Sequence, residues 1–347
     1  MIVTRTPFRI TLGGGGTDLP SFYRKHGGFV LALGIDKYMY VALNVPYADR
    51  KVRLHYTQSE TVDRVEDLKH ELAREALMLH NIHDGIEIAS LADLPAGTGL
   101  GSSSSYLVGL LNGIRAYIGK PAAFDEIAEE ACRIELDVLG KPIGKQDQYM
   151  ASAGGLTELH IDRSGAVTVK RIPLPQYAVA EFISNTHLYY TNVQRTTTDI
   201  LGEQKKSLDA GPGAVEDNLL RIREIGYKIA EAVRDADFDA FGRLTHEHWL
   251  AKKQLSPSVT VSSAERLYDY VREEYNVLGG KIAGAGGGGF LMLYCPSKSS
   301  HKLTDFMARQ GMVRLSYSAE YEGSRVVTNL LTSRSIPYYL VPEPVLV

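Results

Sequence analysis

Cysteine is scarce in this chain of 347 residues, and its two copies, Cys132 and Cys295, are far apart in the sequence. Such a pair gives neither a disulfide framework nor a cysteine metal site, so we expect two buried thiols. The ten histidines lack a metal-ligand spacing, because His246 and His248 are two positions apart on a predicted helix and cannot share a face. The composition therefore indicates neither a disulfide-stabilised protein nor a histidine-rich metal site.

The chain also lacks an excess of one charge and a long apolar run. Its formal net charge is −3, with 38 basic and 41 acidic residues, and the basic residues are dispersed, so no nucleic-acid surface is predicted. No segment reaches the roughly 18 apolar residues of a membrane span, and residues 1–10 hold no apolar core of signal-peptide length. We expect a cytoplasmic protein with no nucleic-acid or membrane partner, and a homo-oligomer is compatible with the sequence.

The length and the apolar patterning predict two domains, which we divide as residues 1–175 and 176–347. In the first domain, strands are predicted at residues 2–12, 29–35, 38–44, 52–56, 85–90, 156–161 and 167–173, and helices at residues 67–79, 106–118 and 124–136. In the second, helices are predicted at residues 215–233, 238–250, 262–275 and 299–310, and strands within residues 279–294 and at residues 312–317. This order of elements indicates an α+β second domain.

The most informative segment is residues 95–105, which combines three glycines with a run of four serines and precedes an apolar helix. Glycine allows positive φ angles and close approach to an anion, and the first N–H groups of a helix attract negative charge. A flexible surface linker is the alternative, but the buried helix that follows disfavours it. The segment is no Walker A motif, since Gly-x-x-x-x-Gly-Lys-Ser/Thr is absent.

Three motifs stand in order along the chain, at residues 7–18, 95–105 and 281–289. This order and spacing, over about residues 6–290, resembles the GHMP kinase superfamily, named for galactokinase, homoserine kinase, mevalonate kinase and phosphomevalonate kinase. The resemblance implies an α+β, two-domain fold. A ribosomal-protein-like N-terminal α/β domain and a ferredoxin-like C-terminal domain would hold ATP and the acceptor in the cleft between them.

Within that superfamily, residues 13–20 and 144–148 resemble sugar 1-kinases that act on heptose phosphate. The resemblance implies ATP- and Mg²⁺-dependent transfer to the anomeric hydroxyl of D-glycero-D-manno-heptose 7-phosphate, toward nucleotide-activated heptose for capsule or lipopolysaccharide. Galactokinases carry Gly-Glu-His-x-Asp-Tyr in the first motif, which this chain lacks. Fucose, another hexose, or phosphorylation elsewhere on heptose stay as alternatives, and so does a catalytically inactive sugar-binding homologue.

The resemblance assigns two catalytic residues. Asp147 matches the aspartate that relatives place against the acceptor hydroxyl, where it would act as general base. Its ordinary reading is a cap on a short helix at residues 148–152. Arg9 matches a Lys or Arg beside that aspartate, where a fixed cation lowers the carboxyl pKa or stabilises charge on the phosphoryl group. Its ordinary reading is a surface arginine at a strand end.

The phosphates and the metal are assigned to the second motif and to a helix upstream of Asp147. Predicted ATP and phosphate ligands are Gly97, Gly99, Leu100, Gly101, Ser102, Ser103 and Ser104. Magnesium prefers hard oxygen ligands, and motif alignment gives the Ser103 hydroxyl and the Glu135 carboxylate, with Asp137 as second choice. Glu135 on a solvated helix face is the alternative.

The acceptor sugar is assigned to the first motif and to scattered cations. Predicted substrate-binding residues are Thr17, Asp18, Lys145, Arg195, Gly286 and Gly287. Asp18 would accept hydrogen bonds from two sugar hydroxyls, although an aspartate after glycines also caps turns. Lys145 and Arg195 are candidates for a subsite that holds a phosphate already on the acceptor, and both are compatible with plain solvent exposure. The glycines of the third motif would let its backbone pack beside the second motif, residues 95–105, which we call the phosphate loop. The alternative is a tight hairpin.

Overall fold

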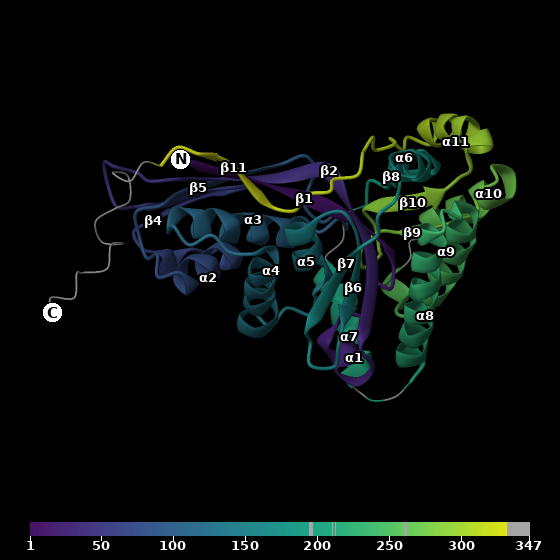
Figure 1. Cartoon of the computed structure of the whole chain (residues 1–347), viewed down its shortest axis with the longest axis horizontal. Coiled ribbons are helices and arrows are strands. Elements are labelled where there is room, and N and C mark those ends of the chain that lie inside the picture. Colours follow the sequence, from purple (N-terminus) through teal and green to yellow (C-terminus); the bar gives the residue numbers. More distant parts are fainter. Residues whose placement is uncertain (194–196, 210, 212, 260–261, 332–347) are drawn as a thin grey trace.

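The computed structural model describes residues 1–331 except 194–196, 210, 212 and 260–261. Two sheets organise the described chain. An eight-stranded sheet extends from the upper left to the centre of Figure 1, with helices beneath its left part, and a three-stranded sheet lies among the helices at the right. The larger sheet has the order β11-β1-β2-β5-β3-β4, with β6 joined to β2 and β7 joined to β6. The smaller has the order β8-β10-β9.

The first part of the chain supplies most of the larger sheet and the helices on it. Its strands are β1 (Ile2–Gly13), β2 (Gly28–Asn44), β3 (Val52–His55), β4 (Ser59–Val62), β5 (Glu87–Ala92), β6 (Leu156–Ile161) and β7 (Val167–Arg171). Its helices are α1 (Pro20–His26), the 3₁₀ turn η1 (Val65–Asp67), α2 (Glu71–Leu79), α3 (Ser102–Tyr117), α4 (Phe124–Cys132), the π-helical η2 (Arg133–Val138) and α5 (Gln146–Ala153).

The remaining part forms the smaller sheet and its helical cover. Its helices are α6 (Gln176–Asn185), α7 (Thr197–Asp209), α8 (Ala214–Arg234), α9 (Phe238–Lys253), the 3₁₀ turn η3 (Pro257–Val259), α10 (Ser262–Glu274) and α11 (Ser297–Arg309). Its strands are β8 (Thr186–Tyr190), β9 (Gly279–Ile282), β10 (Phe290–Tyr294) and β11 (Arg325–Asn329). The hairpin predicted within residues 279–294 is confirmed, since β9 and β10 pair antiparallel.

The strands predicted at residues 29–35 and 38–44 form one continuous strand, β2. Its pairing with β1 shifts register where Pro7 lies opposite Tyr38 and Phe8 opposite Ile35, so two extra residues bulge on the β2 side. A bulge bends a strand without ending it, and β2 therefore pairs with β6 along its first half and with β5 along its second. The separate strands were a wrong prediction, because charged residues 36–37 resemble a turn.

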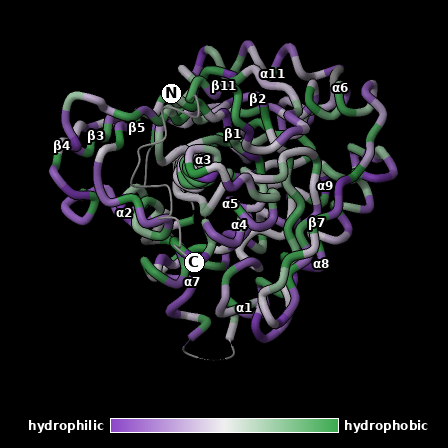
Figure 2. Tube along the Cα trace, turned by 60° about the vertical axis from the view of Figure 1, so that its left-hand side comes forward, coloured by the Kyte–Doolittle hydropathy of each residue, from purple (hydrophilic) through white to green (hydrophobic). Residues whose placement is uncertain are grey.

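Helix α3 packs on the larger sheet through two glycines. A Cβ at Gly109 would lie 2.7 Å from the Thr6 hydroxyl oxygen, and one at Gly113 would collide with the Leu43 side chain. Eleven residues of this helix are buried, and Figure 2 shows it in mostly green, apolar colours near the middle of the molecule. Close packing fixes the direction of α3, and its N-terminus follows directly from the serine-rich segment.

The helix predicted at residues 124–136 changes character before its end. Its α-helical part α4 ends at Cys132, and the next turn, η2, is π-helical. Single π turns inside helices occur often at functional sites. Within η2 the Glu135 side chain is buried while Asp137 is exposed, so this turn selects which carboxylate faces inward.

The region after residue 310 departs most from the prediction. Residues 312–317 form no strand but touch β8 at one isolated bridge, Tyr189 to Arg314, and a second bridge joins Ile35 to Ala319. The chain then returns to the larger sheet as β11, which pairs antiparallel with β1 and was not predicted. The division after residue 175 stays a proposal, and it coincides with the passage from β7 to α6.

Both cysteines are buried free thiols, as predicted. In the described part of the chain, no helix has the length and apolar character needed to cross a membrane. The largest apolar cluster contains residues of both sheets and of helices α3, α8 and α9. The two sheets therefore share a core, and this shared core holds them in a fixed position relative to each other.

Candidate active site

A cavity of about 200 Å³ lies between the two sheets. Residues of all three sequence motifs line it, together with side chains from α7 and α9. Its lining is Arg9, Thr11, Gly15, Gly16, Asp18, Leu19, Gly97, Gly99, Gly101, Ser102, Ser103, Ser104, Glu135, Lys141, Ile143, Gly144, Gln146, Asp147, Leu201, Gln204, His248, Lys252, Leu255, Lys281, Gly284 and Ala285.

The glycine-rich segment before α3 has the conformation that the sequence predicts. Gly97, Gly99 and Gly101 all have positive φ, at 75°, 78° and 84°. Gly101 is the N-cap of α3, and no side chain caps that end of the helix. The first N–H groups of a long helix, left uncapped beside a cavity, provide an anion site. Ser102, Ser103 and Ser104 line the cavity at this helix end.

The third motif packs backbone against backbone on the phosphate loop. A Cβ on Gly284 would lie 2.7 Å from the carbonyl oxygen of Gly99, and one on Gly99 would lie 2.8 Å from that of Ala283. Both positions also have positive φ. The third motif is therefore both the β9–β10 hairpin and a close neighbour of the loop, so its two readings are compatible.

Arg9 and Asp147 form an ion pair at the cavity. The Arg9 Nε and one terminal nitrogen donate to Asp147 Oδ1 at 2.8 and 2.5 Å, and the other terminal nitrogen donates to the Gly99 carbonyl at 2.7 Å. Asp147 lies inside α5, whose N-cap is Lys145 and not Asp147. The cap reading of Asp147 is therefore wrong, and so is the surface reading of Arg9, which is 3% exposed.

Only one oxygen of the Asp147 carboxylate is bound in this way. In the described structure no hydrogen bond reaches Oδ2, whereas Oδ1 accepts both Arg9 bonds. Arg9 also donates to the phosphate loop, so one guanidinium sets the position of the carboxylate relative to that loop. A carboxylate held this way, with a free oxygen facing a cavity, can take a proton from a bound hydroxyl.

Glu135 is buried at the cavity wall. Its Oε2 accepts from the Ser104 hydroxyl at 2.8 Å and from Gln148 Nε2 at 2.6 Å, and Lys141 Nζ lies 4.0 Å from Oε1. Burial raises the pKa of this carboxyl, and the charge of Asp147 adds to the rise. A nearby cation would reverse that shift. Asp137, the second choice for the metal, is exposed and lies outside the lining.

Asp18 joins the first motif to the loop before α5. Its Oδ1 accepts from the Gly16 N–H at 3.0 Å, and its Oδ2 accepts from the Gln146 N–H at 3.1 Å. A side chain at Gly144 would collide with this carboxylate, so that glycine permits the approach. Burial raises the pKa of Asp18. Asp18 thus has the turn contact of its ordinary reading and also faces the cavity.

Three predicted ligands lie in the protein interior and do not line the cavity. Leu100 is a core side chain, and its carbonyl accepts from the Arg9 N–H. The Thr17 hydroxyl lies within 2.8 Å of the Gly14 and Phe29 carbonyls, where it joins the first motif to β2. Lys145 Nζ donates to both Glu129 oxygens and to the Gly165 carbonyl. These contacts occupy the polar groups of Thr17 and Lys145, and the ligand roles of both residues stay predictions.

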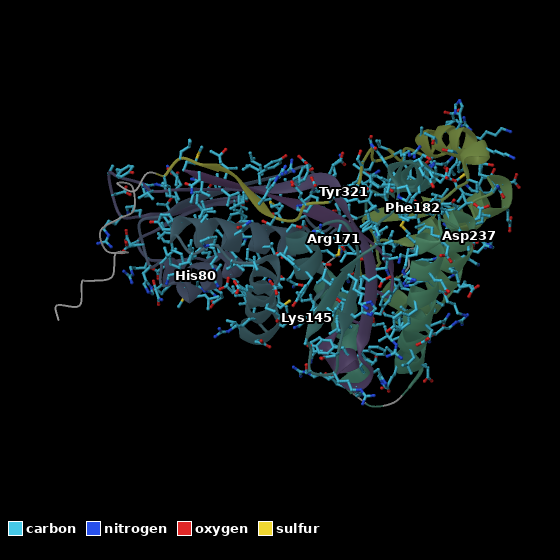
Figure 3. All side chains as sticks on the ribbon, viewed as in Figure 1. His80, Lys145, Arg171, Phe182, Asp237 and Tyr321 are labelled. Atoms are coloured by element: carbon cyan, nitrogen blue, oxygen red, sulfur yellow. The ribbon has the colours of Figure 1, made fainter. Side chains whose placement is uncertain are left out.

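The position of Lys145 is visible in Figure 3, where it is labelled between α4 and β6. The residue is adjacent to cavity-lining Gln146, but its side chain points the other way. Gly286 and Gly287 are also outside the lining, because they pack on Val259: the Gly287 N–H donates to its carbonyl at 2.7 Å. Arg195 lies outside the described residues.

Sequence reasoning missed a cationic group on the part of the cavity wall that α9 and β9 form. His248 and Lys252 come from α9, and Lys281 comes from β9; all three are at least 92% buried and line the cavity. Burial lowers the pKa of Lys252 to about 7, and it also lowers those of Lys281 and His248. The spacing of four between His248 and Lys252 was the available signal, since it places both on one face of a helix.

Two family models match this chain. The model of the GHMP kinases N terminal domain matches residues 65–155, and that of the GHMP kinases C terminal domain matches residues 229–311. Together they match half of the chain. The matched parts contain the phosphate loop, α3, η2 and α5 in one case, and α9, β9 and β10 in the other.

Two relatives and one solved structure extend this match. The chain is 29% identical to the D-glycero-alpha-D-manno-heptose 7-phosphate kinase of Campylobacter jejuni, over 90% of this chain and 95% of that protein. It is 28% identical to the L-fucokinase/L-fucose-1-P guanylyltransferase of Bacteroides fragilis, over 83% of this chain but only 34% of that longer protein.

The solved structure is that of a D-glycero-D-manno-heptose 1-phosphate kinase from Bacteroides thetaiotaomicron. It is similar with a TM-score of 0.77, over 95% of this chain and 99% of that one, at 19% identity. At that identity the likeness concerns the fold alone, and it agrees with the two-domain α+β architecture expected from the sequence. With both family models matched in order across the two halves of the fold, this chain belongs to the GHMP kinase family.

Proposed function

We propose that this chain transfers the γ-phosphoryl group of ATP to the anomeric hydroxyl of D-glycero-D-manno-heptose 7-phosphate. The product would lead to nucleotide-activated heptose for a surface polysaccharide. The observation that carries the kinase activity is the Arg9–Asp147 pair, which lies at the cavity beside Gly101, the N-cap of helix α3. Family membership supports ATP as phosphoryl donor, and the Campylobacter relative supports the acceptor.

In the proposed reaction Asp147 Oδ2 accepts the proton of the sugar hydroxyl as the new P–O bond forms. Arg9 stays on Oδ1 and keeps the carboxylate oriented. Ser102, Ser103 and the free N–H groups of α3 stabilise the negative charge of the phosphates. Because phosphoryl transfer depends mostly on position and charge, this fixed geometry accounts for most of the expected rate gain.

The residues at the cavity fit a magnesium ion carried by the nucleotide. Glu135 is a buried carboxylate beside Ser104, and Ser103 is an exposed hydroxyl in the same turn. These are hard oxygen ligands, and Mg²⁺ accepts few protein ligands when phosphates and water complete its shell. In the described residues no group of three or more His, Cys, Asp or Glu side chains could hold a metal by itself. When bound, the ion would neutralise charge on the transferring phosphate.

The test is ADP release from Mg-ATP with heptose 7-phosphate, heptose, mannose, galactose and fucose, and NMR assignment of the product phosphate. Turnover confined to heptose 7-phosphate, with the phosphate on the anomeric oxygen, is the expected result. Asp147→Asn keeps the shape and an Arg9 contact but removes the base, so its kcat should fall by about 10² to 10⁴. Turnover of an unphosphorylated hexose would overturn the acceptor.

A second acceptor, L-fucose, is favoured by one comparison. The Bacteroides fragilis relative is a fucokinase joined to a guanylyltransferase, and the match covers 83% of this chain. A fucokinase needs no site for an acceptor phosphate. Equal kcat/KM values for fucose in the presence and absence of 10 mM inorganic phosphate, together with no turnover of heptose 7-phosphate, would favour this acceptor.

A further inference from the structure

The cavity wall formed by α9 and β9 carries two lysines whose N–H donors are only partly paired in the described structure. Lys252 Nζ donates to the Ile282 carbonyl at 2.9 Å and to the Gly284 carbonyl at 2.5 Å. Lys281 Nζ donates to the Leu12 carbonyl at 2.8 Å. A lysine ammonium has three N–H donors, so at least one from Lys252 and two from Lys281 have no protein acceptor in the described structure.

A histidine completes the group. His248 is 1% exposed, and among the described residues neither ring nitrogen has a hydrogen-bond partner. Buried side-chain nitrogens without partners are uncommon, and each one calls for an explanation. His248 lies one helical turn before Lys252 on α9, and both line the cavity. The imidazole therefore adds a further unused donor beside the two ammonium groups.

No carboxylate balances these lysines. Among the ion pairs of the described residues, none includes Lys252 or Lys281. The charge that acts on Lys252 is that of Arg9, and the charges that act on Lys281 are those of Lys252 and Arg9. Removing an ammonium group from water costs several kcal/mol unless an opposite charge compensates. Lys253, the next residue on α9, points away from the cavity and pairs with Glu265. Of these two adjacent lysines, only the one that lines the cavity lacks an ion pair to a described residue.

We propose that Lys252, Lys281 and His248 form a binding site for a phosphate dianion on the cavity wall formed by α9 and β9. A tetrahedral phosphate accepts several hydrogen bonds and supplies the charge that the two lysines lack. The site adjoins the reaction centre, because the carbonyl that binds Lys252 is that of Gly284, whose backbone packs on Gly99. Arg9 also binds the Gly99 carbonyl.

Two phosphates could occupy this site, namely one carried by the acceptor sugar and the group transferred from ATP. Binding of the acceptor phosphate rests on the proposed function, because it requires a phosphorylated sugar. Binding of the group transferred from ATP requires only that the protein is a kinase. The chemistry is the same, so kinetics with two acceptors distinguish them. A site for the acceptor phosphate acts on the KM of the phosphorylated sugar only, whereas a site for the transferred group acts on kcat with every acceptor.

The experiment compares Lys252→Met and Lys281→Met with the native protein, and Lys253→Met is the matched control. Methionine keeps the length and the apolar stem but removes the charge. Isothermal titration with inorganic phosphate measures the site directly, without turnover. Each cavity variant should weaken phosphate binding about tenfold or more, as expected for lost hydrogen bonds to a charged group, and Lys253→Met should leave it unchanged.

Steady-state kinetics with heptose 7-phosphate and with heptose then assign the source. A higher KM for the phosphorylated sugar alone supports the acceptor phosphate, and an equal fall in kcat for both supports the transferred group. Unchanged phosphate affinity in both folded variants, checked by thermal melting, would overturn the proposal. Since the titration needs no sugar substrate, phosphate binding in a protein that turns over none of the sugars would uphold this site and reject the proposed function.

Discussion

The two walls of the cavity differ in how their charges are satisfied. On the wall formed by β1, α3, η2 and α5, each functional carboxylate is held: Asp147 by Arg9, Glu135 by Ser104 and Gln148, and Asp18 by two backbone N–H groups. On the wall formed by α9 and β9, the hydrogen bonds of the two lysines to described residues all end on carbonyl oxygens. The first wall is organised before substrate binds, and the second is left incomplete without an anion.

Removal of Arg9 from the first wall is expected to cause the largest loss of catalytic rate. Arg9→Met takes two donors from Asp147 and one from the Gly99 carbonyl, so the carboxylate and the phosphate loop lose their common support. We expect kcat to fall by about 10²-fold or more, as for other fixed charged donors at a reaction centre.

The double variant Arg9→Met/Asp147→Asn provides the check. If Arg9 acts through Asp147, the double variant should be no slower than Asp147→Asn alone, because residues that act as a unit are not additive. Effects that multiply would instead show that Arg9 acts on the phosphoryl group independently of the carboxylate.

The carboxylate of Glu135 should govern the magnesium requirement. Glu135→Gln keeps the Ser104 and Gln148 contacts but removes the charge, so the Mg²⁺ concentration for half-maximal rate should rise by about tenfold or more. Asp137→Asn is the control, since Asp137 is exposed on the same π turn. An equal shift in both variants would point to long-range charge and not to a ligand.

Burial of Lys252 without an ion pair to any described residue should make the stability of the folded protein depend on pH. Around Lys252 the charged and titratable groups are Arg9 on β1, His248 on α9 and Lys281 on β9. Burial lowers the pKa of Lys252 from 10.5 to about 7. Between these values the unfolded chain holds a proton that the folded protein has released, so the contribution of Lys252 to stability rises with pH.

Lys252→Met removes the penalty of burying a charge. Its melting temperature should exceed that of the native protein by a few degrees at pH 6, and the gap should narrow toward pH 9. Saturating phosphate should narrow the gap at pH 6 as well, because the anion stabilises only the charged native site. A gap that does not vary with pH would mean that methionine acts by apolar packing alone.

Lys145 is expected to have the smallest effect on catalysis. Lys145→Met breaks the contacts to Glu129 and to the Gly165 carbonyl but leaves the cavity lining intact. The melting temperature should drop, while the KM for heptose 7-phosphate should match that of the native protein. A rise in that KM would restore Lys145 as a ligand of the acceptor phosphate.

Lys145 and Lys252 show what the sequence could and could not predict. Residues that belong to a motif, such as Arg9, Ser103 and Asp147, were found because their local pattern carries the chemistry, and the structure brings them to one cavity. Lys145 was predicted as a ligand from its proximity to Asp147 in the sequence, but proximity does not fix the direction of a side chain, and Lys145 does not line the cavity. Lys252 was missed because Lys252 and Lys253 together resemble a solvated helix end, and only the packing of α9 against β9 separates them.

The same limit applied to the fold. The hairpin at residues 279–294 and the long helices were predictable from local periodicity, which each segment carries by itself. Strand β11 was not, because its residues are alternately exposed and partly buried at a sheet edge, and its partner β1 lies about 300 residues away. Pairing at such separation leaves little trace in a short window of sequence.

The position of β11 also has a consequence for how the protein is made. β1 precedes β11 in the chain and is synthesised before it, and it lies between β2 and β11 in the folded sheet. Its outer edge stays bare until residues 325–329 have been synthesised, and a bare edge invites pairing with other chains. The larger sheet therefore gains its edge strand only after the smaller sheet has been synthesised, and until then the edge of β1 is open to pairing with other chains.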